Sequence, residues 1–297
     1  MAESSRPRTV AALRELIASR LTGCVDDPQD EARELLSALH DAPRSWSTAH
    51  ADDELIDLLI DAAEDAAARR IAGAPMAYAT GRAAFRHLFL HVDERVLIPR
   101  PETEELVTLA LPHIAAGCTV VDVGTGSGAI ALAIAQESRA ARVVGTDISP
   151  GAIEVAELNA RAVLQREYAR TEFLQGNLLE PLGDERIDVV VSNPPYIALV
   201  EREELPPAVK NFEPAQALFG GVDGMQVIRA LVSQAEARLT AGGMLLMEID
   251  ARRAAEARAL ASEPHWRDVR VVPDAFGRDR FVVARRTAAV ARVSAAC

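Results

Sequence analysis

The residues Asn193, Pro194, Pro195 and Tyr196 bring an amide side chain, proline-flanked carbonyls and an aromatic ring together in one short segment. They follow an apolar run, Ile187–Ser192, that predicts a buried strand, so they lie where this strand ends in a loop. The Asn193 side-chain oxygen and the Pro194 carbonyl can each accept one N–H, which holds a planar nitrogen with its lone pair exposed. Tyr196 can pack on the flat group beside that nitrogen. We therefore interpret the four residues as a catalytic and substrate-binding site for a weakly nucleophilic nitrogen.

A glycine-rich segment follows another predicted buried strand and opens a predicted helix. It consists of Gly124, Thr125, Gly126, Ser127 and Gly128. Glycines let the backbone approach a ligand where a Cβ would clash, and the start of a helix offers unpaired amides. About twenty residues further on, Asp147 ends the next strand, from which a carboxylate can accept both hydroxyls of a ribose. Together these features predict a site for a nucleoside-containing cofactor.

The glycine spacing and a neighbouring acid distinguish between two such cofactors. The pattern is GxGxG rather than GxGxxG, so the third glycine of the pyrophosphate-binding pattern is displaced. Asp122 also places an acid beside the loop, which suits a sulfonium and an amino group and would repel a pyrophosphate. Both observations favour S-adenosylmethionine over a nicotinamide cofactor. The remaining alternative, a tight strand-to-helix turn that binds no ligand, is disfavoured by Asp147.

The expected chemistry is the transfer of a methyl group from a sulfonium to the planar nitrogen. Ligands of a doubly wound sheet bind beyond the carboxyl ends of its strands, so Asn193 should lie near the cofactor as well as the substrate. No strong base is required, because the nitrogen becomes acidic only once it is methylated. The rate would come from positioning and from two acceptors that stabilise positive charge on nitrogen. The alternative is that Asn193 and Pro194 form a plain turn.

The elements that would position these residues alternate between strand and helix, which predicts an α/β fold with a doubly wound, mostly parallel sheet. The predicted strands are residues 119–123, 142–147, 172–174, 187–192 and 244–249. The predicted helices are residues 103–113, 129–138, 151–164, 225–239 and 254–262, and a long loop covers 197–224. Residues 269–272 and 280–284 are expected to form a final antiparallel pair.

The chain before this region predicts a small helical bundle. Apolar residues at helical spacing predict one helix through Val10 and Leu21, ended by Gly23, and a second that starts at Asp27-Pro28. The apolar residues of the second are Ala32, Leu35, Leu36 and Leu39, and a longer helix is predicted at 51–71. The longer helix should turn Leu55, Leu58, Leu59, Ala62 and Ala66 inward. A hairpin of strands at 85–92 and 95–98, with its turn at 93–94, should follow. The expected division is a helical recognition domain at 1–84, a hairpin linker at 85–99, a catalytic domain at 100–286 and a disordered tail at 287–297.

Composition narrows the class of protein and of substrate. The 297 residues exceed one average domain, and a net charge of −12 opposes stable binding to a phosphate backbone. No apolar run reaches the roughly 18 residues of a membrane span, and the first residues lack the apolar centre of a signal peptide. The three cysteines lack the spacing of a disulfide framework or a zinc site. We therefore expect a soluble, cytoplasmic protein, monomeric and without a metal.

At these residues the chain resembles the peptide chain release factor N5-glutamine methyltransferases. Besides the tetrapeptide, the likeness includes VLIPRPETE at 96–104, Glu213-Pro214 with Ala217-Leu218, GGVDG at 220–224, and Gly242-Gly243 before Glu248-Ile249. It covers residues 70 to 285 or thereabouts, after a helical domain of the expected size. The tetrapeptide alone is less specific, since methyltransferases acting on the amino groups of adenine and cytosine share it as Asp/Asn/Ser-Pro-Pro-aromatic.

The resemblance implies a seven-stranded methyltransferase domain, a helical domain that grips the release factor, and a substrate glutamine in the factor's Gly-Gly-Gln loop. By position, the glycine loop and Asp147 would hold S-adenosylmethionine, Asn177 and Leu178 would flank its adenine, and Asn193–Tyr196 would hold the glutamine. Two positions depart from the family's pattern. The family often has Asp where Asn177 stands, and usually Gly where Asp250 stands.

Two other functions are compatible with parts of the sequence. An amino methyltransferase acting on adenine or another base of DNA or RNA would use the same tetrapeptide, but the acidic balance and the absence of a basic, aromatic-rich region disfavour it. A non-catalytic sensor of an adenosyl ligand would leave Asn193–Tyr196 without a purpose.

Overall fold

The computed structural model describes residues 6–261 and 264–287. The chain forms two compact units. The first takes in Met1–Ala84, Phe89–Glu94 and Pro206–Phe212, and the second Phe85–Leu88, Arg95–Leu205 and Glu213–Cys297. The tail expected at 287–297 lies outside the described residues, apart from Thr287. Within the described ranges, no helix combines the length and the apolar character that crossing a membrane requires.

Three helices form the core of the first unit: α1 (Val10–Leu21), α2 (Pro28–Leu39) and α4 (Asp57–Ile71). Both predicted helices are confirmed, and the second begins at Pro28 after the predicted N-cap Asp27. The Thr9 hydroxyl accepts from the Ala12 amide and the Asp27 carboxylate from the Asp30 amide, so each helix has a side-chain N-cap. Two short helices, α3 (Trp46–Ala49) and α5 (Met76–Thr80), belong to the same unit.

The predicted start of the third helix at residue 51 is wrong, because backbone bonds to the chain before α1 replace the helical ones. The Leu55 amide donates to the Arg8 carbonyl at 3.1 Å, and Glu54 forms a bridge with Thr9. The helix therefore begins at Asp57, and Leu58, predicted to face inward, is 75% exposed.

The predicted hairpin is displaced. Its strands are β1 (Arg82–Phe85) and β2 (Leu88–His91), and residues 95–98 form no strand. The turn falls at Arg86, whose φ is 52° and whose amide donates to Glu104 Oε1 at 3.0 Å. The Arg86 guanidinium also pairs with the Glu137 carboxylate. The sequence suggested one strand over 85–92, but these long-range contacts place a turn near its start, at Arg86.

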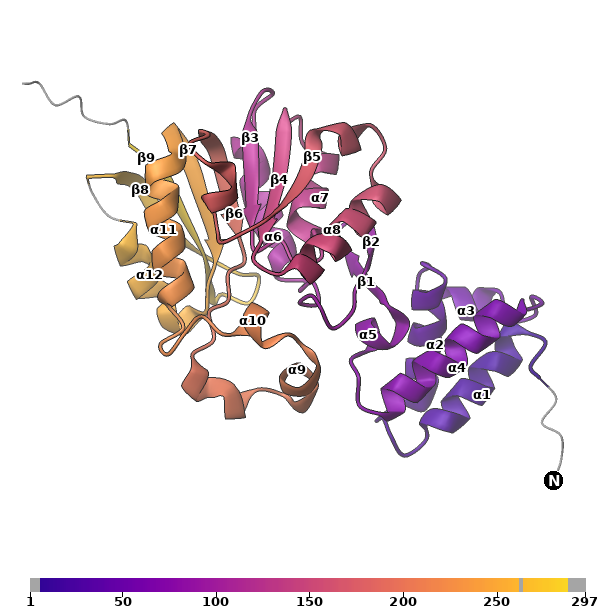
Figure 1. Ribbon diagram of the computed structural model, residues 1–297. Coiled ribbons are helices and arrows are strands. Elements are labelled where there is room, and N and C mark those ends of the chain that lie inside the picture. The colour runs from indigo at the N-terminus through magenta and orange to yellow at the C-terminus, as the bar shows by residue number, and fades with distance from the viewer. Residues whose placement is uncertain (1–5, 262–263, 288–297) are drawn as a thin grey trace, which may run out of the picture. The chain divides into compact units, whose positions relative to one another are not determined.

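Seven strands of the second unit form one sheet in the order β5-β4-β3-β6-β7-β9-β8 (Figure 1). Five run parallel: β3 (Thr119–Val123), β4 (Arg142–Asp147), β5 (Thr171–Gln175), β6 (Ile187–Ser192) and β7 (Leu239–Glu248). β9 (Asp279–Arg286) is antiparallel to both β7 and β8 (Trp266–Pro273). The predicted mostly parallel, seven-stranded architecture is confirmed.

Helices cover both sides of this sheet, as expected for a doubly wound fold (Figure 1). α7 (Ala129–Glu137) packs on β3, β4 and β5, α8 (Pro150–Val163) on β4 and β5, and α11 (Gln226–Arg238) on β7. α6 (Thr103–Ala110) packs on β6 and β7, and α12 (Ala254–Leu260) on β8 and β9. The region predicted as a loop at 197–224 contains two short helices, α9 (Pro207–Phe212) and α10 (Ala215–Leu218).

The pairing of β3 with β6 sets the position of the two predicted functional segments. The runs of valine in both strands are buried, as parallel strands covered on two sides require. In register, Val123 at the end of β3 lies opposite Ser192 at the end of β6. The strand order reverses at this pair, so the glycine loop and Asn193 emerge side by side at the switch point of the sheet.

Candidate active site

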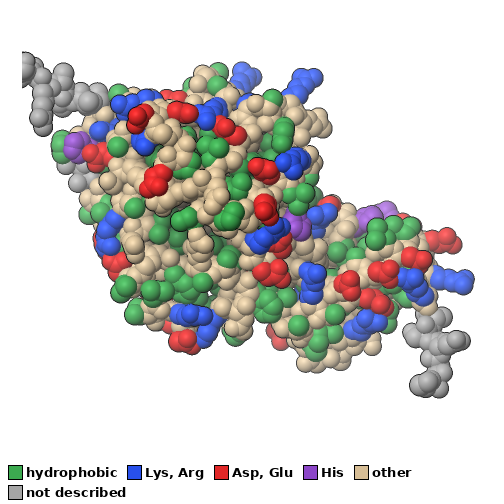
Figure 2. All heavy atoms as spheres, viewed as in Figure 1, with side chains coloured by type: hydrophobic (Ala, Val, Ile, Leu, Met, Phe, Trp, Pro, Cys, Tyr) green, Lys and Arg blue, Asp and Glu red, His purple; other side chains and the backbone are tan. Residues whose placement is uncertain are grey.

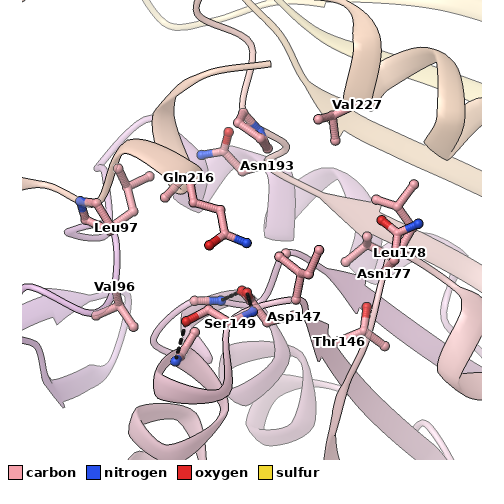
Figure 3. A pocket seen from close by; sticks show the side chains of 18 of the residues that line it. Val96, Leu97, Thr146, Asp147, Ser149, Asn177, Leu178, Asn193, Gln216 and Val227 are labelled. Atoms are coloured by element: carbon pink, nitrogen blue, oxygen red, sulfur yellow. Dashed lines mark hydrogen bonds between the residues drawn. The ribbon is translucent and has the colours of Figure 1, made fainter. Parts of the chain in front are cut away.

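A cavity of about 290 Å³ opens at the carboxyl edge of the sheet in the second unit. Its walls come from the residues after β3, β4, β5 and β6, from residues 95–97, and from the segment around α10. In Figure 3, Asn193 and Asp147 lie on opposite sides of this space, and Gln216 extends into it between them. Asn177 and Leu178 form a further part of the wall.

The cavity brings together most of the predicted site residues: Gly124, Gly126, Asp147, Asn177, Leu178, Asn193 and Pro195. Five others are not among the lining residues: Thr125, Ser127, Gly128, Pro194 and Tyr196. Contacts of these five with a cofactor or substrate stay predictions.

The glycine loop is held in place by the neighbouring strand. The amides of Gly124 and Thr125 both donate to the Thr146 carbonyl, at 2.8 and 2.9 Å. The Gly126 amide donates to Asp147 Oδ2 at 3.0 Å, and the Ser149 amide to Asp147 Oδ1 at 2.9 Å. Burial raises the pKa of Asp147, and these backbone bonds oppose that rise. The Asp147 carboxylate thus holds the loops at Gly126 and Ser149 in place, and Asp147 also lines the cavity.

Ser127 and Gly128, at the end of the glycine loop, contact the neighbouring helices. The Ser127 carbonyl accepts from Asn159 Nδ2, on α8, at 2.9 Å. A Cβ on Gly128 would lie 3.1 Å from the Leu132 side chain and 3.3 Å from Ala156 Cβ, so the glycine permits α7 and α8 to pack closely. These contacts hold the end of the loop in place.

Asp122, on β3, contacts the glycine loop but does not line the cavity. It is fully buried; one oxygen accepts from the Thr125 hydroxyl at 2.7 Å and from the Ala131 amide at 3.1 Å. Its other oxygen has no partner among the described residues. Desolvation raises the pKa of Asp122 to about 7. Asp122 therefore lies beside the glycine loop, as predicted, and its described contacts organise that loop, while an effect of its charge on the bound cofactor stays a prediction.

Asp122→Asn should change the dependence of stability on pH. Folding raises the pKa of Asp122 from 3.8 to about 7, so the folded protein keeps a proton that the unfolded chain releases between these values. The wild type should therefore lose about 3 kcal/mol relative to Asp122→Asn as the pH rises from 5 to 8. Urea unfolding of both proteins at both pH values measures this difference. Parallel pH profiles would contradict a protonated Asp122.

Asn193 is hydrogen-bonded to Thr103 and, through Thr103, is linked to Glu248. Its Nδ2 donates to Thr103 Oγ1 at 3.1 Å, and the Thr103 hydroxyl donates to Glu248 Oε2 at 2.7 Å. The Tyr196 hydroxyl donates to Glu248 Oε1 at 3.3 Å. These four residues form a continuous chain of hydrogen bonds, called the Asn193–Glu248 chain below.

Tyr196 packs against the core of the second unit rather than lining the cavity. Desolvation and the nearby Glu248 carboxylate raise the pKa of its hydroxyl, which therefore stays protonated and donates. A contact between the Tyr196 ring and a substrate stays a prediction.

The segment Gly220–Gly224 packs against the backbone of the Asn193–Tyr196 loop. Ile197 forms a bridge with Phe219, and the Gly220 amide donates to the Ile197 carbonyl at 3.0 Å. A Cβ on Gly220 would lie 2.3 Å from the Pro195 carbonyl oxygen, so only glycine allows this approach. These glycines belong to a segment that carried the resemblance to the family. Close packing of the backbone is the physical reason why glycine is needed there.

Gly224→Ala should cost more stability than Gly242→Ala. Both glycines have positive φ, 76° and 83°, so alanine is strained at either position. A Cβ on Gly224 would lie 2.4 Å from the Tyr196 carbonyl oxygen and 2.4 Å from Arg253 Nε, whereas nothing lies within 4 Å of one on Gly242. The additional cost should be about 1–3 kcal/mol, as urea unfolding can measure. Equal losses at the two positions would contradict the close packing.

The two departures from the family's pattern both have structural explanations. Asn177 lines the cavity and its Nδ2 donates to Glu180 Oε1 at 2.8 Å. Asp250 has φ −76° and ψ 137°, a conformation open to any residue, and its carboxylate accepts from the Arg252 amide at 2.8 Å. The chain therefore needs no glycine at position 250.

Several residues near Asn193 were not predicted as site residues. Val96, Leu97 and Gln216 line the cavity, while Thr103 and Glu248 act through hydrogen bonds. The sequence could have pointed to most of them only through the resemblance to the family, whose segments include residues 96–104, Ala217 and Glu248. Gln216 lies beside such a segment at a position without a signal of its own.

Comparisons with known proteins agree with this geometry. Residues 103–208 match the family described as the methyltransferase small domain, and residues 12–81 match the PrmC N-terminal domain. The release factor glutamine methyltransferase of Geobacter sulfurreducens is 39% identical over 88% of this chain and 90% of its own length. The enzyme of that name from Moorella thermoacetica is 39% identical over 93% of this chain and 97% of its own. A methyltransferase structure from Pyrococcus furiosus, 16% identical, has the same fold, with a TM-score of 0.52 over 69% of this chain and 91% of its own.

Proposed function

This chain belongs to the family of release factor glutamine methyltransferases, and from that premise we propose that it methylates the glutamine of the Gly-Gly-Gln loop in peptide chain release factors. The acceptor is the side-chain amide nitrogen of that glutamine. One observation carries the proposal: the register of β3 with β6 brings the cofactor loop and Asn193 to one cavity.

S-adenosylmethionine is the cofactor and supplies an electrophilic methyl group on a sulfonium. The residues of the cavity fit its adenosyl part. Asp147 uses two lone pairs for the amides of Gly126 and Ser149, so further lone pairs remain for ribose hydroxyls. Thr146, which also lines the cavity, has a buried hydroxyl without a partner among the described residues, so a ligand can satisfy it.

In the proposed mechanism, Asn193 and Pro194 hold the substrate amide. Asn193 Oδ1 and the Pro194 carbonyl each accept one N–H, so the nitrogen lone pair points towards the cofactor. The bound cofactor would supply its methyl group to this nitrogen and leave as a neutral thioether, and the methylated nitrogen would release one proton to water. Both acceptors stabilise the positive charge that develops on nitrogen. The amide is neutral again after the proton leaves, so a base is unnecessary.

A protein substrate is supported by the charge of the molecule. The net charge is −12, and on the face in Figure 2 acidic and basic side chains are interspersed without a continuous basic area. Such a surface offers little attraction to a phosphate backbone. We assign recognition of the release factor to the helical unit, and we propose that the enzyme acts as a monomer without stable nucleic acid binding.

The proposal is tested with purified protein and S-adenosylmethionine labelled in its methyl group. Label should appear on intact release factors and should be absent from a release factor whose loop glutamine is replaced by alanine. DNA and ribosomal RNA serve as competing acceptors in parallel reactions. Label on either nucleic acid instead of the release factor would overturn the proposal.

A further inference from the structure

We propose that Thr103 and Glu248 are positioning residues that fix the side-chain amide of Asn193 with its oxygen towards the cavity. The proposal rests on the proposed function, because the acceptor role of Asn193 gives this orientation its purpose. It deepens that function by explaining how the enzyme presents an acceptor rather than a donor to the substrate amide.

The direction of each hydrogen bond in the Asn193–Glu248 chain follows from a count of protons. An ionised carboxylate only accepts, so the hydroxyls of Thr103 and Tyr196 must donate to the two oxygens of Glu248. The single proton of Thr103 is then committed, and its oxygen can only accept from Asn193. Asn193 must therefore turn its NH₂ group to Thr103 at 3.1 Å, which leaves Oδ1 for the cavity.

The opposite orientation of Asn193 would prevent catalysis. The oxygen and the NH₂ group of an asparagine have nearly the same shape, so packing alone discriminates poorly between the two orientations. A flipped amide would present N–H groups to the N–H groups of the substrate. It would also set Oδ1 against Thr103 Oγ1 with no proton between them. The chain thus selects the productive orientation.

Burial makes this selection strong. Thr103 is 4% exposed and Glu248 1%, so water cannot replace the missing partner of either group. The positive charge of Arg280, on β9, opposes the desolvation of Glu248, whereas Glu102 has the same sign as Glu248. Arg280 is itself held by Asp274 at 3.1 Å. The bonds from Thr103 and Tyr196 and the charge of Arg280 favour the ionised form of Glu248, against the burial that raises its pKa.

The chain predicts a dependence of activity on pH. Burial raises the pKa of Glu248, while the bonds from Thr103 and Tyr196 and the charge of Arg280 counteract it. A protonated Glu248 could donate to Thr103, whose hydroxyl would then be free to donate to Asn193 and so favour the flipped amide. The rate should therefore fall as the pH drops through the pKa of Glu248.

The experiment compares Thr103→Val with Thr103→Ser in the full-length protein. Valine has the shape of threonine but cannot accept from Asn193, whereas serine keeps the hydroxyl. Thr103→Val should lower kcat about 10- to 100-fold and leave the dissociation constant of S-adenosylmethionine within twofold. Thr103→Ser should restore most of kcat. Glu248→Gln should also lower kcat and should remove the loss of activity at low pH that depends on Glu248.

Three outcomes would overturn the positioning role: a wild-type kcat in Thr103→Val, an equal loss of kcat and cofactor affinity, or a Thr103→Ser variant as slow as Thr103→Val. A nuclear magnetic resonance measurement separates this failure from failure of the proposed function. The side-chain amide protons of Asn193 should shift when Thr103 is replaced by valine, whether or not a release factor is methylated. Unchanged resonances would also overturn the role.

Discussion

Asn193→Ala is expected to lower kcat by about 10²–10³-fold, the usual effect of removing a preorganised group that stabilises transition-state charge. Alanine removes the acceptor that orients the substrate amide and stabilises positive charge on its nitrogen. The dissociation constant of S-adenosylmethionine should change much less, because Asp147 and the glycine loop make the other cofactor contacts expected from the cavity. Initial rates at saturating release factor and calorimetric titration with the cofactor measure the two quantities.

Gln216→Ala is the matched control for Asn193→Ala. Gln216 presents a second side-chain amide to the same cavity but has no place in the Asn193–Glu248 chain (Figure 3). Its replacement should therefore lower kcat much less than Asn193→Ala does. Equal losses of kcat and cofactor affinity in Asn193→Ala would instead mean that Asn193 mainly supports the fold.

Asp147→Ala should produce the largest loss of cofactor affinity, about 10²–10³-fold, because two hydrogen bonds to a charged acceptor disappear together. The loss includes the order that Asp147 gives to the loops at Gly126 and Ser149. Titration calorimetry with S-adenosylmethionine measures it. Affinity in the wild type should also fall as the pH drops through the raised pKa of Asp147, since the ribose hydroxyls need the ionised form as acceptor.

Asp188→Ala separates this effect from general damage to the sheet. Asp188 also lies on a strand and accepts a backbone amide, that of Thr119, at 2.9 Å, but it does not line the cavity. Its replacement should reduce stability and leave cofactor affinity nearly unchanged. An Asp147→Ala variant that binds the cofactor as tightly as Asp188→Ala would rule out the ribose contact.

Sequence patterns predicted the ends of those strands that are determined by residues close by in the chain. β3, β4 and β6 have the predicted ends, because runs of buried β-branched residues stop at a glycine loop, a helix cap and a proline. The grouping of Gly124, Gly126, Asp147 and Asn193 also followed, since the carboxyl ends of parallel strands meet at one edge.

Long-range contacts explain what sequence patterns missed. The turn at Arg86 depends on Glu104 and Glu137, and the start of α4 depends on the backbone of Arg8 and Thr9. Thr103 and Glu248 are separated by 145 residues, and no periodicity or spacing relates them. The burial of Asp122 beneath the loop depends likewise on the packing of a helix, through the Ala131 amide.

The Asn193–Glu248 chain also has a consequence for the order of folding. Its bonds join residues that are 90 and 145 positions apart, whereas Gly126 and Asp147 are 21 apart. Contacts of long sequence separation close late, because more chain must be ordered first. A chain synthesised only as far as Tyr196 would have the glycine loop, Asp147 and Asn193 but no Glu248. During synthesis, the capacity to hold the cofactor should therefore arise before the capacity to transfer its methyl group.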